Sequence, residues 1–250
     1  MLSEAAWLGT GLAFGLPLVT GTAEKVPGDN SKADSKLKVV VTGGHPGDPE
    51  YGCGGTIARF TDMGHEVVLL YLNRGDPAEK ANGEGSVVRI AEARKACEIL
   101  KARPAYVGQI DGKAVVDPAH YEQFRKIIEA EGPDLVFTHW PIDNHADHRA
   151  ISMLVYDAWL KMGKKFALYY YEVSNGEDTV QFTPTNYVDI SQTASRKRLA
   201  CYAHASQSPD RYYELQESVA RWRGTESGHK QAEAYIRHVQ SRDIGPLMGL

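Results

Sequence analysis

The chain has 250 residues, a net charge of -4, and 28 Lys and Arg residues against 32 Asp and Glu residues. This length is enough for one domain with a large core, and the near-balanced charge argues against nucleic acid as the main partner. Three cysteines (Cys53, Cys97 and Cys201) are too few for a disulfide framework or a cysteine-based zinc site. Whether two of them form a disulfide stays open, and so does the oligomeric state.

The chain begins with an uncharged apolar stretch, Ala5 to Ala23, that Pro17 and four glycines interrupt. A membrane-spanning helix needs about 20 strongly apolar residues, so we expect no stable membrane span in the mature protein. We interpret residues 1–23 as an export signal that ends at Gly21-Thr22-Ala23, although Lys and Arg are missing from its start. The alternative is a loosely packed arm. We therefore expect a periplasmic or extracellular protein, with a cytoplasmic one as the alternative, and a polar linker over residues 24–37.

From residue 38 onward, predicted strands and helices alternate. Apolar and β-branched runs predict strands at 38–42, 66–72, 105–110, 134–138, 166–173 and 187–190. Helical periodicity and capping signals predict helices at 49–63, 86–101, 118–131, 149–162, 191–205 and 230–240. The region from Ser208 to Gly228 gives no clear pattern. This alternation predicts a single α/β domain over residues 38–250, with a Rossmann-like, mostly parallel sheet and helices on both faces.

The first chemical motif follows the first predicted strand, where His45 and Asp48 lie three residues apart. Ligands of open parallel sheets bind outside the carboxyl ends of the strands, so this imidazole and carboxylate occupy a functional position. The alternative is that Asp48 only caps the next helix, as Asp commonly does.

The second motif is the segment His139 to His148, which carries three histidines and two aspartates after a predicted parallel strand. It should lie at the same sheet edge as His45 and Asp48. Imidazole and carboxylate are ordinary zinc ligands, and a catalytic zinc typically has three protein ligands. His45 and Asp48 with His145 or His148 would complete such a site, although Fe, Mn or Co would accept the same donors. The alternative is a solvated helix start, with Asp147 favoured by the helix dipole.

Together the motifs resemble those of the PIG-L/LmbE family of zinc-dependent N-deacetylases, over about residues 38 to 240. The family's opening His-Pro-Asp-Asp-x-Glu motif is matched by His45-Pro46-Gly47-Asp48-Pro49-Glu50, and its later His-x-Asp-His motif by His145-Ala146-Asp147-His148. Arg89 to Glu92 resembles the family's Arg-x-x-Glu, and Ala203 to Gln207 its His-x-Ser-Gln segment.

The resemblance implies a role for each matched residue. Zinc would be held by His45, Asp48 and His148, His145 would assist the tetrahedral intermediate, and Arg89 would contact the substrate. It also implies an N-acetylglucosamine-type substrate, because the family acts in glycosylphosphatidylinositol, mycothiol and bacillithiol synthesis and in chitobiose breakdown. The expected partner is therefore a small amino sugar or glycoconjugate.

One position departs from the family pattern. The first Asp of the Asp-Asp pair, the family's general base, is Gly47 here, and general-base assistance contributes typically ~10²–10⁴-fold. Another carboxylate could replace it, with Asp143, Glu50 and Asp147 as candidates, or zinc alone could suffice for an easier substrate. A third interpretation is a non-catalytic zinc- or glycan-binding protein on the same fold. Asp143 also suits a turn, and Asp147 suits a partner that holds a ligating imidazole.

Overall fold

The computed structural model describes residues 36–75 and 84–244. The expected export segment, residues 1–23, and most of the expected linker lie outside the described residues, so both stay predictions. The elements follow in chain order as β1 (Lys38–Gly43), α1 (Asp48–Asp62), β2 (Glu66–Tyr71), α2 (Glu84–Leu100), β3 (Arg103–Tyr106), α3 (Pro118–Glu131), β4 (Leu135–His139), α4 (Ala146–Lys161), β5 (Ala167–Tyr171), β6 (Asn186–Asp189), α5 (Ala194–Tyr202), α6 (Pro209–Ser227) and β7 (Ala232–Arg237). A short 3₁₀ turn, Ala205–Gln207, joins α5 to α6.

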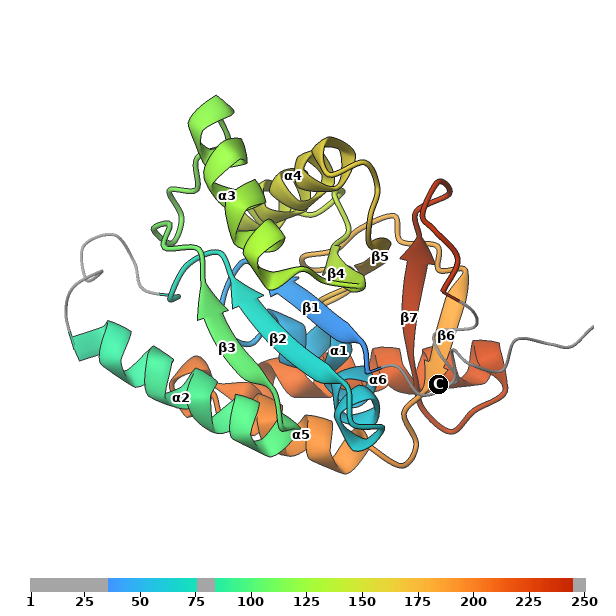
Figure 1. Cartoon of the computed structure of the whole chain (residues 1–250). Helices are drawn as coiled ribbons and strands as arrows, with labels where there is room; N and C mark the ends of the chain where they lie inside the picture. The colour runs from blue at the N-terminus through green and yellow to red at the C-terminus, as the bar shows by residue number, and fades with distance from the viewer. Residues whose placement is uncertain (1–35, 76–83, 245–250) are drawn as a thin grey trace, which may run out of the picture. The chain divides into compact units, whose positions relative to one another are not determined.

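These strands form a seven-stranded sheet in the order β3-β2-β1-β4-β5-β7-β6. β1 to β5 run parallel, whereas β7 pairs antiparallel with both β5 and β6. Helices α3 and α4 cover one face, and α1, α2 and α5 cover the other (Figure 1). The expected mostly parallel sheet with helices on both faces is confirmed.

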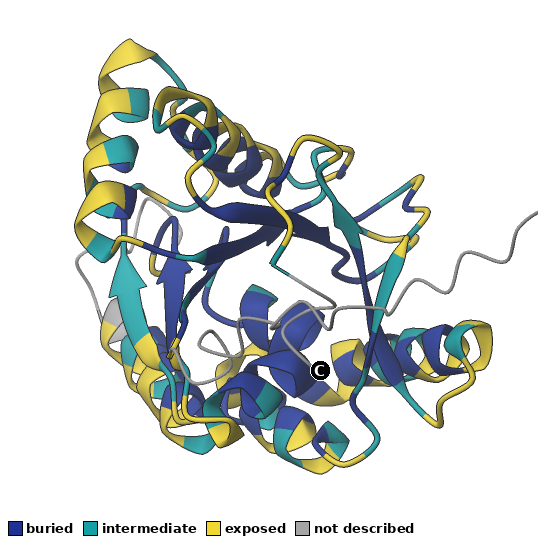
Figure 2. Cartoon of the chain, turned by 45° about the vertical axis from the view of Figure 1, so that its right-hand side comes forward, coloured by how far each residue is buried: buried dark blue, intermediate teal, exposed yellow. Residues whose placement is uncertain are grey.

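Side-chain alternation along the strands explains the two-faced core. Val39 and Val41 of β1 belong to the apolar cluster that contains α1, α2 and α5 residues. Val40, between them, belongs to the cluster with α3 and α4 residues. Successive residues of a strand point to opposite faces, so a strand covered on both sides is apolar throughout. Figure 2 shows the central strands as continuously buried.

The predicted helix at 230–240 is wrong, because strand β7 occupies Ala232–Arg237. The segment reads AEAYIR and contains good helix formers, but its backbone groups pair with β5 on one side and β6 on the other. Tertiary pairing of this kind overrides weak local propensity. The unclear region from Ser208 to Gly228 is a long helix, α6, with Pro209 in its first turn and Gly228 as its left-handed C-cap.

The topology sets where ligands can bind. β1 and β4 are adjacent parallel strands, so the loops that follow them leave the same edge of the sheet. Among the described residues, no helix combines the length and apolar character needed to cross a bilayer.

Candidate metal centre and active site

Two glycines shape the loop after β1, Gly44 through a close approach to His148 and Gly47 through its backbone conformation. A Cβ on Gly44 would lie 2.9 Å from His148 Cδ2, so only glycine lets the two segments meet there. Gly47 has a φ of 117°, a backbone conformation that L side chains rarely adopt. Across this turn the His45 backbone N–H donates to Asp48 Oδ2 at 2.8 Å. The turn therefore places Asp48 at the first residue of α1, facing back toward His45.

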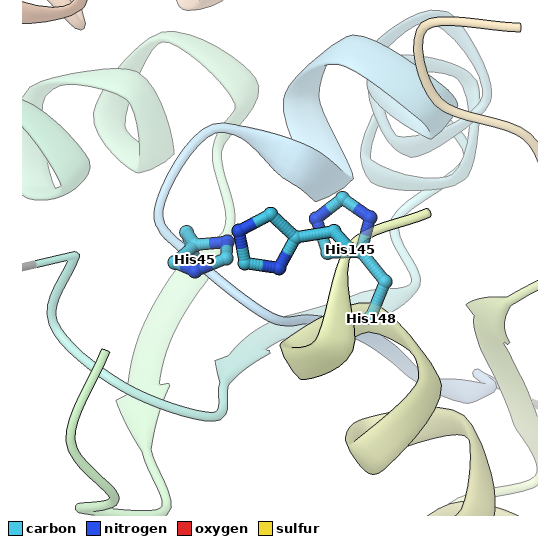
Figure 3. Close-up of side chains that lie close together, drawn as sticks. All are labelled: His45, His145 and His148. Carbon is cyan, nitrogen blue, oxygen red and sulfur yellow. The ribbon is translucent and has the colours of Figure 1, made fainter. Parts of the chain in front are cut away.

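The second segment brings its histidines to the same place. His145 is the N-cap of α4 and its Nδ1 accepts from the Asp147 backbone N–H at 3.2 Å. His148 lies in the first turn of α4, with its Nε2 3.2 Å from Asp48 Oδ2. The same oxygen is 3.3 Å from His45 Nδ1. Figure 3 shows the rings of His45, His145 and His148 gathered around the start of α4. The predicted ligands from two distant segments thus come together.

Carboxylates contact the second ring nitrogens of both predicted ligand imidazoles, those of His45 and His148. Asp143 Oδ1 lies 3.0 Å from His148 Nδ1, and its Oδ2 accepts from the Thr179 hydroxyl at 2.9 Å. Asp147 Oδ2 lies 3.2 Å from His45 Nε2. Metal-ligating histidines are usually oriented by such carboxylates. The contacts of Asp143 and Asp147 therefore favour the positioning of ligands over a role as general base.

The donor atoms fit a divalent cation. His45, His145 and His148 each offer a nitrogen within 4.8 Å of the others, and Asp48, His139 and His148 form a second such set. These two sets share His148, and a third set consists of His45, Asp111 and Asp147. Asp48 Oδ2 faces the nitrogens of both His45 and His148. A mixed imidazole and carboxylate set suits zinc and other first-row metals.

Asp48 and the histidines around it shift one another's pKa values. Burial lowers the pKa of His148, but attraction to Asp48 and Asp143 outweighs it and raises this pKa to about 9. Burial opposes ionisation of Asp48 as well, yet His148, His139 and His45 hold the pKa of Asp48 well below its usual range. The cluster is thus built to keep Asp48 negative, which is the form that binds a metal.

Two other histidines of the cluster have lowered pKa values, whereas the pKa of His148 is raised. Burial, followed by repulsion from His148, lowers the pKa of His139 to about 4. Burial, followed by repulsion from His45 and His148, also lowers the pKa of His145. Because its Nδ1 accepts from the Asp147 N–H, a neutral His145 carries its proton on Nε2. It can donate a hydrogen bond from that atom without being cationic.

A cavity of about 400 Å³ opens beside the cluster, and its lining includes His45, Asp48, His145, His148 and Arg89. Arg89 is 6% exposed, and its Nη2 donates to the Pro46 carbonyl at 2.7 Å. Its Nε and Nη1 are buried and have no partner among the described residues. An arginine with two unsatisfied donors at a cavity is suited to bind oxygen atoms of a ligand.

The two remaining motif segments contact each other and the loop after β1, and His204 and Gln207 of the second segment line the cavity. Ser206 donates from its backbone N–H and its hydroxyl to the two carboxylate oxygens of Glu92, at 2.7 Å each. His204 Nε2 lies 3.0 Å from Glu50 Oε1. Glu50 also accepts from the Gly47 backbone N–H at 3.1 Å and from the Tyr71 hydroxyl at 2.7 Å. With three contacts and no exposure, Glu50 holds the loop together rather than facing the cavity.

Sequence reasoning assigned no role to two residues of the cluster. Asp111 Oδ1 lies 3.1 Å from His45 Nε2. Asp111 follows the edge strand β3, where the sequence offers only an Asp-Gly turn as a signal. His139 is fully buried, stacks on His148 with ring centroids 4.0 Å apart, and has its Nε2 3.3 Å from Asp48 Oδ2. His139 is the last residue of the buried strand β4, and this position at the sheet edge was the sequence feature that could have indicated its place in the site.

Comparisons with known proteins agree with the geometry. The model of the PIG-L family, described as GlcNAc-PI de-N-acetylase, matches residues 40–159. The chain is 30% identical to a diacetylchitobiose deacetylase of Thermococcus kodakarensis over 237 residues, which cover 84% of this chain and 88% of the relative. The chain belongs to the PIG-L family of deacetylases.

Solved structures show the same fold. The conserved protein TT1542 from Thermus thermophilus has a TM-score of 0.73 at 26% identity, and the match covers 84% of this chain and 98% of that protein. GalB, a 4-carboxy-2-hydroxymuconate hydratase from Pseudomonas putida, has a TM-score of 0.71 at 22% identity, with 84% and 98% covered. The similarity to GalB, at 22% identity, shows the fold alone. Membership of the PIG-L family therefore rests on the sequence match and the motifs.

Proposed function

We propose that this PIG-L protein is a zinc-dependent hydrolase that removes the N-acetyl group from an N-acetylglucosamine-type sugar or a related amide. The observation that carries the proposal is Asp48 Oδ2, which lies 3.3 Å from His45 Nδ1 and 3.2 Å from His148 Nε2 beside a cavity. About 400 Å³ falls within the range of small-molecule sites. The Thermococcus relative is named for diacetylchitobiose, which makes this disaccharide the first substrate to test.

Each residue of the site has a separate role in the proposed hydrolysis. A divalent cation held by His45, Asp48 and His148 would polarise the acyl oxygen and acidify water. Asp143 and Asp147 keep the two imidazoles oriented by holding His148 Nδ1 and His45 Nε2. The neutral His145 donates from Nε2 to the oxygen on which charge develops, and the unsatisfied Arg89 donors bind substrate oxygens.

Acetate release tests the proposal. Zinc-loaded protein is incubated with diacetylchitobiose, N-acetylglucosamine, its glycosides and related amides, and the released acetate is measured. The His148→Ala variant, purified and loaded in the same way, is the control. We expect release by the wild type on at least one amide and almost none by the variant. If the two are equally slow on every amide, the hydrolase proposal fails.

A second candidate, a non-catalytic zinc- or glycan-binding protein, is favoured by one observation. Gly47 has no side chain to act as a base. This candidate predicts one zinc per chain and calorimetric binding of diacetylchitobiose without acetate release. Binding with turnover excludes it.

We also propose that residues 1–23 direct export. Sequencing of the N-terminus of protein secreted by its native host tests this. A mature chain that begins near Glu24 supports export, whereas an intact Met1 in the cell interior contradicts it.

A further inference from the structure

The carboxylates around the metal centre are almost all engaged. Glu50 has three hydrogen-bond contacts and is fully buried. Asp143 is held by the His145 N–H, His148 and Thr179. Asp147 Oδ2 meets His45 and also accepts from Asn73 and from the Gly112 N–H. Their contacts leave none of the three carboxylates suggested by the sequence in the position of a base.

Asp111 is also engaged, and its place is unsuitable. Its Oδ1 lies 3.1 Å from His45 Nε2, whereas the nitrogen of His45 that faces Asp48 is Nδ1, on the other side of the ring. Asp111 therefore lies behind His45 with respect to Asp48, and it shares the Nε2 proton with Asp147. A base must reach the attacking water directly or through one further water.

Asp178 differs from these groups in its contacts, although Asp111 lines the same cavity. It is partly buried and lines the cavity together with His45, Asp48 and His148. Its side chain contacts Ser174, and no imidazole, Lys or Arg lies within ion-pair distance of it among the described residues. It is thus a carboxylate in the cavity wall that forms no ion pair among the described residues and hydrogen-bonds to Ser174.

The backbone around Asp178 is fixed to the ligand loop. The Asn144 N–H donates to the Asp178 carbonyl at 2.8 Å, and the Asp178 N–H donates to the Ser174 carbonyl at 3.0 Å. Asp143 and Thr179 form an antiparallel bridge next to it. The segment that carries Asp178 is therefore attached to Asp143 and Asn144, which immediately precede His145. In the proposed site, His145 would contact the substrate.

The charges facing Asp178 suit a proton acceptor. Burial raises the pKa of Asp178, and repulsion from Asp143 and Asp48 raises it further, while His148 and the Ser174 hydrogen bond act in the opposite direction. A carboxylate with a raised pKa is a stronger base than an ordinary one, and efficiency increases as the pKa of a base approaches the working pH.

From this geometry we propose that Asp178 is the general base that replaces the side chain missing at Gly47. The inference rests on the proposed hydrolase function. Asp178 accepts a proton from water as the water oxygen bonds to the acyl carbon. The proton then passes to the amide nitrogen as the carbon–nitrogen bond breaks, so that acetate and the free amine leave. No oxidant or further reactant is needed.

The test compares Asp178→Asn with Glu177→Gln. Both variants remove one negative charge from the wall of the same cavity, where Glu177 is exposed and Asp178 is partly buried. We expect Asp178→Asn to lower kcat by about 10²–10⁴-fold and to abolish the acidic limb of the kcat/KM profile, while Glu177→Gln changes kcat less than about threefold. Zinc affinity, measured on metal-free protein by competition with a chromophoric chelator, should stay within about tenfold for both, because Asp178 is not a ligand.

Each outcome decides something. If Asp178→Asn keeps its kcat and its acidic limb while the wild type is active, Asp178 is not the base, and the hydrolase function stands. If Asp178→Asn weakens zinc binding about a hundredfold or more, Asp178 is a metal ligand and the proposal is overturned. If equal losses occur in both variants, a general charge effect is the cause and the proposal is overturned as well. If the wild type cleaves no amide, the proposed function falls and this inference falls with it.

Discussion

Asp143 and His148 form a buried carboxylate–imidazole pair, with Asp143 Oδ1 3.0 Å from His148 Nδ1. The pair leaves His148 Nε2 facing Asp48 at 3.2 Å. In the proposed metal site Asp143 orients His148, and the pair connects the turn after β4 to the loop after β1.

The first prediction concerns that pair. Asp143→Asn should weaken zinc binding by about 10–100-fold, because the second partner of a ligating imidazole fixes its orientation and raises its basicity. Chelator competition on metal-free protein measures the change. Asp157→Asn, further along α4, is the control and should leave zinc affinity unchanged. Equal affinities for wild type and Asp143→Asn would rule out the positioning role.

The second prediction concerns a buried ion pair between α5 and β7. Lys197 Nζ lies 2.6 Å from Glu233 Oε1, and both side chains are almost fully buried. Lys197→Met should destabilise the protein by about 3–5 kcal/mol, because it leaves the Glu233 charge buried without its cation. Chemical denaturation measures the free energy of unfolding. Lys101→Met breaks the exposed pair with Asp62 and should cost less than about 1 kcal/mol. Similar costs for the two variants would contradict the argument.

The third prediction is a pH dependence of stability. Hydrogen bonds from Arg196 and then Lys101 lower the pKa of Asp62 from 3.8 to about 2. A lowered folded-state pKa stabilises the protein above the unfolded value, and the stabilisation is lost as the pH falls from about 4 toward 2. Asp62 is 46% exposed, so solvent screening limits its contribution to less than about 1 kcal/mol.

Denaturation of Asp62→Asn and wild type between pH 7 and pH 3 tests this dependence. The difference in unfolding free energy should be largest at pH 7 and should shrink toward pH 3. A difference in unfolding free energy that grows as the pH falls would have the opposite sign. It would show that the ion pairs of Asp62 do not cause the pH dependence.

The fourth prediction concerns Gly47. Its φ of 117° strains any L residue, so Gly47→Ala and Gly47→Asp should both cost about 1–3 kcal/mol, visible as a lower Tm. A Cβ there meets only Tyr51 and His204 atoms at 3.8 Å or more, so crowding adds little. If Asp178 is the base, Gly47→Asp should be no more active than Gly47→Ala. A large gain for Gly47→Asp over Gly47→Ala would show that the wild type lacks a working base.

The sequence predicted the sheet and the meeting of the ligand motifs well, for one physical reason. Buried parallel strands are continuous apolar runs, and β1 and β4 are such runs with chemistry at their ends. Two motifs that follow buried parallel strands emerge at the same edge of the sheet, as the sequence predicted, whereas the adjacency of β1 and β4 that brings Asp48 to His148 comes from the structure.

Other parts depended on contacts that no local pattern encodes. β7 is a strand because β5 and β6 flank it, although its residues favour a helix. Asp178 lies far beyond His148 in the chain, and its approach to the cavity follows from the Asn144 and Ser174 contacts. The sequence suggested Asp143 as a base because it is a carboxylate near the histidines, but only the structure shows that three donors already occupy it.

The most direct test of the account is acetate release from diacetylchitobiose as zinc is added stepwise to metal-free protein. We predict that release rises in proportion to zinc and levels off at one equivalent per chain, and that His148→Ala stays inactive throughout. Release that is independent of zinc, or equal in wild type and His148→Ala, would contradict it.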